Sequence, residues 1–190
     1  MGSLKRHDEN PDLQIIKLAH QALDIARSNP QHGIELAEEL HKLSNELNSD
    51  KGLARAQTCK GICQVWLGKY DDALKNLFAA IQKLRKAEDA KFESHALYHI
   101  FAAFYFLADY DEAIKYALDM LHHSYEHKDR LSQANALNAI GTVHYTTGED
   151  EKAIADLFMG LEIASHYDDQ QLIARLLDGL GSAYFNLKNI

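Results

Sequence analysis

The sequence predicts an all-α protein, an α-α superhelix in which antiparallel helix pairs stack into a solenoid. One stretch, GICQVWLGKYDDA at 61–73, returns as FAAFYFLADYDEA at 101–113, as GTVHYTTGEDEKA at 141–153 and as GSAYFNLKNI from 181, always 40 residues on. A fixed period of this length is typical of stacked supersecondary units. Each copy joins an apolar, Ala-rich run to a second run that opens with acidic residues, so each unit is predicted to be a helical hairpin.

The first helix pair is predicted to be a degenerate copy of the later ones. The polar start of the chain lacks an apolar core, so residues 1–11 are predicted to be a flexible tail and not a signal peptide. Apolar residues recur at helical spacing over 13–26 and again over 34–47, with Pro30 tolerated early in the second helix. Weak terminal repeats are expected of solenoid ends.

Three glycines lie inside predicted first helices, at Gly61, Gly141 and Gly181. Glycine costs about 0.8 to 1 kcal/mol against Ala in a helix interior, so something must compensate. We expect the second helix to approach closely there, through Ala73 and Ala153, which follow twelve positions later.

Other positions in the 40-residue register mark helix ends and one irregularity. Gly68 and Gly148 are predicted to end their helices in the left-handed conformation. Phe101 stands where the other copies carry glycine and is predicted to force a locally wider hairpin. Four residues just before apolar runs are predicted N-caps: Ser49, Asp89, Asp129 and Asp169.

The spacing G-x6-G-x-Y-x2-A resembles the tetratricopeptide repeat over residues 12–190. The resemblance implies one repeat domain of four helix pairs plus the first helix of a fifth. The period exceeds the family's usual ~34 residues and is similar to the long-repeat variety of kinesin light chains, cell-polarity adaptors and bacterial signalling proteins. HEAT and armadillo arrays also have periods near 40, but their motif lacks this spacing.

Composition argues against several classes of partner. A net charge of -8 and a pI near 5.7 disfavour a phosphate backbone as ligand, so no nucleic acid is expected. The longest apolar run, 100–108, is far shorter than the ~18 residues of a membrane span, which predicts a soluble, cytoplasmic protein. Cys59 and Cys63 are interpreted as small core residues in a reducing compartment.

No motif for catalysis, metal or cofactor binding stands out, so the region is predicted not to be an enzyme. His95 and His99, like His123 and His127, are spaced to share a helical face, but two ligands do not make a zinc site. The segment HHSYEH at 122–127 also lacks the Glu that must follow the first His of HExxH.

The resemblance implies that the first helices of successive units line a concave surface. Asn offers a donor and an acceptor to a peptide group, and Arg offers a fork for carboxylate. The alternative is that the same positions are ordinary solvated or packing residues. The predicted groove residues are Arg55, Thr58, His95, Tyr98, Tyr105, Asn135, Asn138, Arg175 and Asp178, with Ile62, Thr142, Tyr145 and Ser182 beside them.

We therefore expect an interaction module that holds a protein or peptide segment in this groove. The alternative is the N-terminal sensory or regulatory region of a larger bacterial signalling protein, such as a diguanylate cyclase or sensor kinase. The last helix, 172–190, presents Leu176, Leu177, Leu180, Ala183, Tyr184 and Leu187 with no second helix to cover them. Either it caps the solenoid or the chain continues, and an uncovered face predicts a homodimer.

Overall fold

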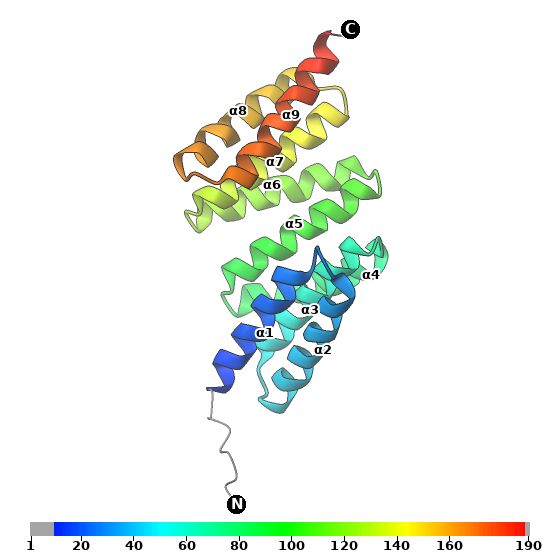
Figure 1. Cartoon of the computed structure of the whole chain (residues 1–190), viewed down its shortest axis with the longest axis vertical. Helices are drawn as coiled ribbons and strands as arrows, with labels where there is room; N and C mark the ends of the chain where they lie inside the picture. Colours follow the sequence, from blue (N-terminus) through cyan, green and yellow to red (C-terminus); the bar gives the residue numbers. More distant parts are fainter. Residues whose placement is uncertain (1–9, 189–190) are drawn as a thin grey trace, which may run out of the picture. The chain divides into compact units, whose positions relative to one another are not determined.

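A computed structural model describes residues 10–188. Within that range the chain is a series of nine α-helices, and the predicted all-α solenoid of helix pairs is confirmed (Figure 1). Residues 1–9 of the predicted tail lie outside the described residues, but Asn10 caps the first helix, which already begins at Pro11. The helices are α1 (Pro11–Ile25), α2 (Pro30–Glu46), α3 (Asp50–Trp66), α4 (Tyr70–Lys86), α5 (Ala90–Phe106), α6 (Tyr110–Glu126), α7 (Arg130–Thr146), α8 (Asp150–His166) and α9 (Gln170–Lys188).

The 40-residue period divides into two steps of 20. Helices α2 to α8 each span 17 residues, and three-residue linkers join them. The predicted left-handed conformation is confirmed at Gly68 and Gly148, with φ of 71° and 82°. The other linkers place a non-glycine residue at the same point: Asn48, Glu88, Ala108, Lys128 and Asp168. In every one of these linkers the next N–H bonds to the carbonyl five residues earlier, as in a Schellman motif.

Three of the predicted N-caps are confirmed. The side chains of Ser49, Asp129 and Asp169 accept backbone N–H groups three residues on, at 3.1, 3.0 and 3.0 Å. These bonds satisfy donors that the first helical turn leaves without partners. The Asp89 carboxylate has a different contact. Its Oδ2 accepts a hydrogen bond from Arg55 Nε at 2.7 Å.

The two inner glycines lie where the hairpins cross tightly. A Cβ at Gly61 would sit 2.7 Å from Leu77 Cγ and 3.2 Å from the Ala73 carbonyl oxygen. At Gly141 the same distances, to Leu157 and Ala153, are 2.6 and 3.3 Å. The predicted close approach of the second helix is therefore confirmed, and a leucine four residues after each alanine fills the space.

The described chain divides into two compact units, one up to Phe92 and one from Glu93. In the first, each of α1 to α3 packs against the next helix and α1 also contacts α3. In the second, α6 to α9 pack in the same order and α7 contacts α9 (Figure 1). The contact between alternate helices brings the first helices of neighbouring pairs together, which is the layer where a ligand groove was predicted.

The two cysteines are free and buried, as predicted for core residues. Burial raises the pKa of the Cys63 thiol to about 11 and that of Cys59 still higher. No helix between residues 10 and 188 is long and apolar enough to cross a membrane.

The interpretation of the last helix is wrong in part. Leu176, Leu180 and Ala183 were predicted to be uncovered, but they are buried in the core formed with α7 and α8. The exposed residues lie on another stripe of α9, at Leu177 and Tyr184. A first helix packs against the preceding pair with one stripe and presents a second stripe to its own partner, and the sequence pattern had merged the two.

Candidate functional site

Three predicted groove residues meet on three successive first helices of the second unit. Arg175 on α9 donates from Nη2 to Asn135 Oδ1 on α7 at 3.0 Å, and from Nη1 to Tyr98 Oη on α5 at 3.4 Å. Arg175 is exposed, while Tyr98 and Asn135 are half-buried. The guanidinium is thus held on the surface by two neutral groups, and no carboxylate among residues 10–188 forms an ion pair with it.

Each partner of Arg175 is itself oriented. The Asn135 amide donates from Nδ2 to the Leu131 carbonyl at 3.0 Å, which turns Oδ1 toward the arginine. The Tyr98 ring packs edge-on against His99, with ring centroids 5.1 Å apart, and against Phe101 at 6.0 Å. A guanidinium carries five N–H groups in a fixed fork, so donors remain for a carboxylate.

Asn138 lies one helical turn after Asn135 and therefore on the same side of α7. Its side chain is half-buried, and the Thr142 hydroxyl donates to its backbone carbonyl at 2.7 Å. No group among the described residues hydrogen-bonds to its side-chain amide. Both a donor and an acceptor thus remain available at this position.

A second polar cluster lies nearer the ends of α5 and α7. Tyr105 Oη is 3.1 Å from Thr146 Oγ1, and both side chains are half-buried. Burial raises the pKa of Tyr145, and negative charge on Tyr105 and on Asp178 raises it further. A hydrogen bond with Thr142 acts in the opposite direction. Asp178, the predicted groove residue on α9, is exposed.

In the first unit the predicted groove residues have internal roles. Thr58 is fully buried and donates to the Ala54 carbonyl at 2.9 Å, and Ile62 is buried as well. The prediction of Thr58 as a ligand contact is wrong, because its register on α3 turns the side chain into the packed interior.

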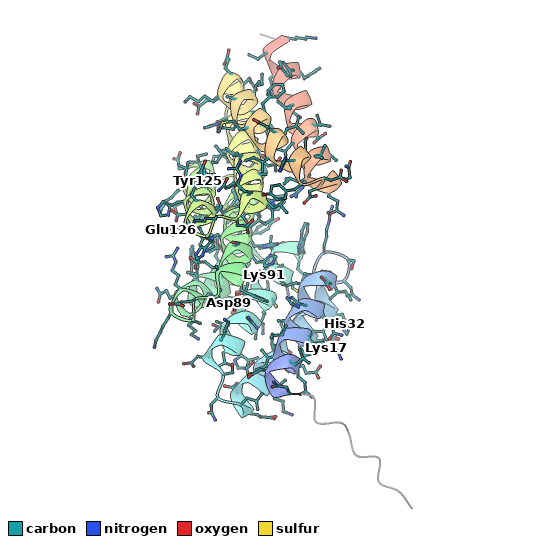
Figure 2. The ribbon with its side chains drawn as sticks, turned by 90° about the vertical axis from the view of Figure 1, so that its left-hand side faces the viewer. Lys17, His32, Asp89, Lys91, Tyr125 and Glu126 are labelled. Carbon is teal, nitrogen blue, oxygen red and sulfur yellow. The ribbon has the colours of Figure 1, made fainter. Side chains whose placement is uncertain are left out.

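Arg55, in contrast, forms an ion pair. Its Nε lies 2.7 Å from the buried Asp89 carboxylate, and its guanidinium stacks over the Phe92 ring at 4.9 Å. Asp89 precedes the first turn of α5, near Lys91 (Figure 2). These contacts give Arg55 a structural role, linking α3 to the start of α5.

His95, also predicted for the groove, is half-buried, and its backbone carbonyl accepts the His99 Nδ1–H at 2.8 Å. That bond fixes the tautomer of His99. Burial lowers the pKa of His99 to about 4, so this ring is neutral near pH 7.

Sequence reasoning missed a buried polar trio between α5 and α6. His123 Nε2 lies 3.5 Å from Glu93 Oε2, and its Nδ1 lies 3.2 Å from Ser94 Oγ. The Glu93 and His123 side chains are each only 8% exposed, so the trio lies inside the helix pair and not in a cleft that a substrate could enter. Residues 29 and 30 positions apart share no motif that would have revealed it.

The histidine pairs do not come together with acidic or thiol groups as a metal centre. The His123 and His127 rings contact each other, with centroids 4.4 Å apart. Among residues 10–188 no group of three or more His, Cys, Asp or Glu side chains is placed to hold a metal ion.

The period, the tight crossing at glycine and the paired first helices define a helical-repeat protein with a fold of the tetratricopeptide type. The sequence matches no protein-family model and no curated protein. Several solved structures, however, have a similar fold. A Rap protein complexed with competence and sporulation factor has a TM-score of 0.79 at 16% identity over 96% of this chain and 54% of that one.

Two further structures agree. The apo form of RapI has a TM-score of 0.74 at 16% identity, covering 97% of this chain and 52% of its own. A putative kinesin light chain of Podosopora anserina, with nearly identical TPR-like repeats, has a TM-score of 0.70 at 12% identity, covering 96% and 90%. The chain therefore spans about half the length of the Rap structures, and at these identities the likeness shows the fold.

Proposed function

We propose that this chain is a non-catalytic interaction module that binds a peptide segment along the first helices of its second unit. The observation that carries the proposal is the exposed Arg175 guanidinium, held at 3.0 Å by Asn135 and at 3.4 Å by Tyr98. An arginine whose hydrogen bonds are to neutral groups keeps its charge for a ligand, and a carboxylate is the group that best fits its fork.

The proposed ligand is an extended or helical peptide with an acidic side chain or a free carboxyl end. Asn138, one turn along α7, can pair with a peptide group whatever side chain that residue carries. The half-buried Tyr98 and Tyr105 offer rigid apolar area with a polar tip. One of the similar solved structures, a Rap protein, is itself complexed with competence and sporulation factor.

A second proposal concerns the context of the same groove. The structurally similar Rap proteins are about twice as long as the part that this chain covers, which supports a regulatory region within a larger signalling protein. Binding in the groove would then control an output domain, such as a cyclic-dinucleotide synthase or kinase. Free, buried thiols support a cytoplasmic location for either role.

The test uses a labelled peptide library in which each acidic member has an amide counterpart. Parent protein should select acidic members, and Arg175→Gln should weaken their binding about ten-fold or more while sparing the amides. Asn138→Ala should weaken both classes by about 1 to 3 kcal/mol, because two hydrogen bonds to the peptide backbone are lost.

Asn45→Ala is the matched control, since Asn45 is an exposed helical Asn on α2, outside the groove. Its affinity should equal that of the parent. Equal binding by all variants would exclude this surface, and a large loss of stability at Asn138→Ala would show that Asn138 is structural.

A further inference from the structure

Helix α9 carries two opposite charges one turn apart on the side that faces α7. Arg175 donates to Asn135 on α7, and Asp178 follows three residues later, a spacing that keeps both on one face of the helix. Asp178 stands 40 residues after Asn138, just as Arg175 stands 40 residues after Asn135. Negative charge on Asp178 also raises the pKa of Tyr145 on α7. The carboxylate therefore belongs to the same groove, one helical turn beyond the guanidinium.

The two charges do not neutralise each other. Opposite charges three residues apart do pair on α6, where Lys115 Nζ lies 3.1 Å from Glu112 Oε2. On α9 the guanidinium of Arg175 instead reaches over α7 to Tyr98 on α5, at 3.4 Å. Asp178 is exposed and forms no ion pair within residues 10–188. Each charge is therefore left for a ligand.

The groove around these two charges is polar but neutral on α7. Its side chains there are those of Asn135, Asn138, Thr142 and Tyr145. On α9 the hydroxyl of Ser182 donates to the backbone carbonyl of Asp178 at 3.1 Å and not to its carboxylate. Binding surfaces match the sign of their ligand, and like charges brought together oppose binding. A purely acidic ligand would be attracted by Arg175 and repelled one turn further on.

We propose that the groove binds a dipolar peptide, in which Arg175 holds an acidic group and Asp178 holds a basic one. The inference rests on the proposed peptide groove and adds the second charge of the ligand. Three residues of an α-helix rise by about 4.5 Å. An extended peptide presents side chains on one face at every second residue, about 6.6 Å apart. A helical peptide does so at every third or fourth residue, about 5 to 6 Å apart.

The paired charges would also fix the direction of the ligand. With the acidic group at Arg175, only one order of acid and base along the peptide places the basic group toward Asp178. The reversed order in the same direction places it away from this carboxylate. The neutral amide of Asn138 can bond to the peptide backbone in either direction. Selectivity for one order would thus come from the charges on α9.

Blocked synthetic peptides test the proposal. Each carries one aspartate and one lysine, in either order, separated by one residue or by three, and its counterpart has glutamine in place of the lysine. The best order and spacing should bind the parent about three- to five-fold more tightly than its counterpart, the size expected of one exposed ion pair. The ratio should shrink as salt is added. Fluorescence titration measures it.

Asp178→Asn should bind the lysine peptide and its glutamine counterpart equally, because the basic group has lost its partner. This variant should still prefer aspartate to its amide, since Arg175 is intact. Asp119→Asn is the matched control, because Asp119 is an exposed aspartate on α6, outside the groove. It should keep the ratio of the parent.

The two proposals fail in different ways. If Arg175→Gln removes the selection for acidic peptides but no lysine peptide exceeds its counterpart in the parent, the groove stands and the dipolar ligand is excluded. A lysine preference that persists in Asp178→Asn, or that Asp119→Asn abolishes as well, would also overturn the inference. If the parent does not select acidic peptides at all, the proposed function fails and this inference fails with it.

Discussion

Two hairpins of the second unit fill the same crossing in opposite ways. Where α7 and α8 cross, Gly141 leaves a gap that Leu157 fills. At the same register α5 carries Phe101, and α6 carries Ala117 in place of the leucine. Phe101 is 6% exposed and Ala117 is fully buried. From this comparison we infer that the repeat preserves the volume at a crossing, whichever of the two helices supplies the large side chain.

A second register position shows the same freedom in its chemistry. Residues twelve apart link the first and second helix of each complete pair from α3 onward. The links are a hydrogen bond of 2.8 Å between Asn76 and Gln64, stacked rings 5.5 Å apart at Phe104 and Tyr116, and a 2.8 Å contact between His144 Nδ1 and Asp156. The twelve-residue spacing is common to the three pairs, while the contact itself is between amides, between aromatic rings, or between an imidazole and a carboxylate.

The largest effect is expected when the bulky side of the crossing is removed. Phe101→Gly should lower the free energy of unfolding by about 4 to 6 kcal/mol, since it combines a large core deletion with a helix-interior glycine. Chemical denaturation measures the change. Ala117→Leu alone should cost about 1 to 3 kcal/mol through overpacking.

The double variant Phe101→Gly with Ala117→Leu rebuilds the arrangement of α7 and α8. We expect it to be more stable than the sum of the two single changes predicts, with a coupling of about 0.5 to 3 kcal/mol. Strict additivity would show that the two side chains do not share one space. In that case the hairpin would have to be wider, as the sequence analysis predicts from Phe101 alone.

His99 separates the two hairpins in their response to acid. Its pKa is lowered to about 4 by burial, while the α7 counterpart is Ala139. In the unfolded chain this histidine takes up a proton near pH 6.5, whereas in the folded chain it stays neutral down to about pH 4. Its contribution to stability is therefore fully present above pH 6.5 and is lost as the pH falls toward 4. The loss for this group amounts to roughly 3 kcal/mol when its pKa falls from 6.5 to about 4.

His99→Ala should therefore flatten the pH dependence of unfolding between pH 6.5 and 4, even though the smaller side chain lowers stability throughout. Denaturation midpoints converted to free energies at several pH values measure the slope. The exposed His122 provides a matched control, because His122→Ala should leave the slope of the parent unchanged. The same slope in His99→Ala and parent would assign the acid sensitivity to other groups.

The sequence predicted what depends on spacing along the chain and missed what depends on direction around a helix. The period, the glycine crossings and the N-caps all follow from fixed offsets. The prediction for Thr58 was wrong because neighbouring positions differ by about 100° around a helix. A residue at the correct height along the helix axis can therefore still lie on the buried face. The contact of Arg55 with Asp89 joins residues 34 apart and follows no motif.

The smallest effect compares two glycines at one register. Gly181→Ala replaces glycine with the best helix former in open space, so the folded chain should gain up to about 1 kcal/mol of stability. Gly141→Ala has the same intrinsic gain, but its Cβ would lie 2.6 Å from Leu157 Cγ and 3.3 Å from the Ala153 carbonyl oxygen. Overpacking of about 1 to 3 kcal/mol should outweigh the gain and make the net change destabilising.

Chemical denaturation of both variants, compared with the parent, measures the two changes in the free energy of unfolding. Opposite signs are expected, because helix propensity is the same and only the covering helix differs. If both substitutions stabilise, α8 can move away from α7 without a loss of stability. The tight crossing would then not explain why position 141 is a glycine. If both destabilise, the backbone of α9 is constrained at Gly181, and the open space around this residue does not decide the sign.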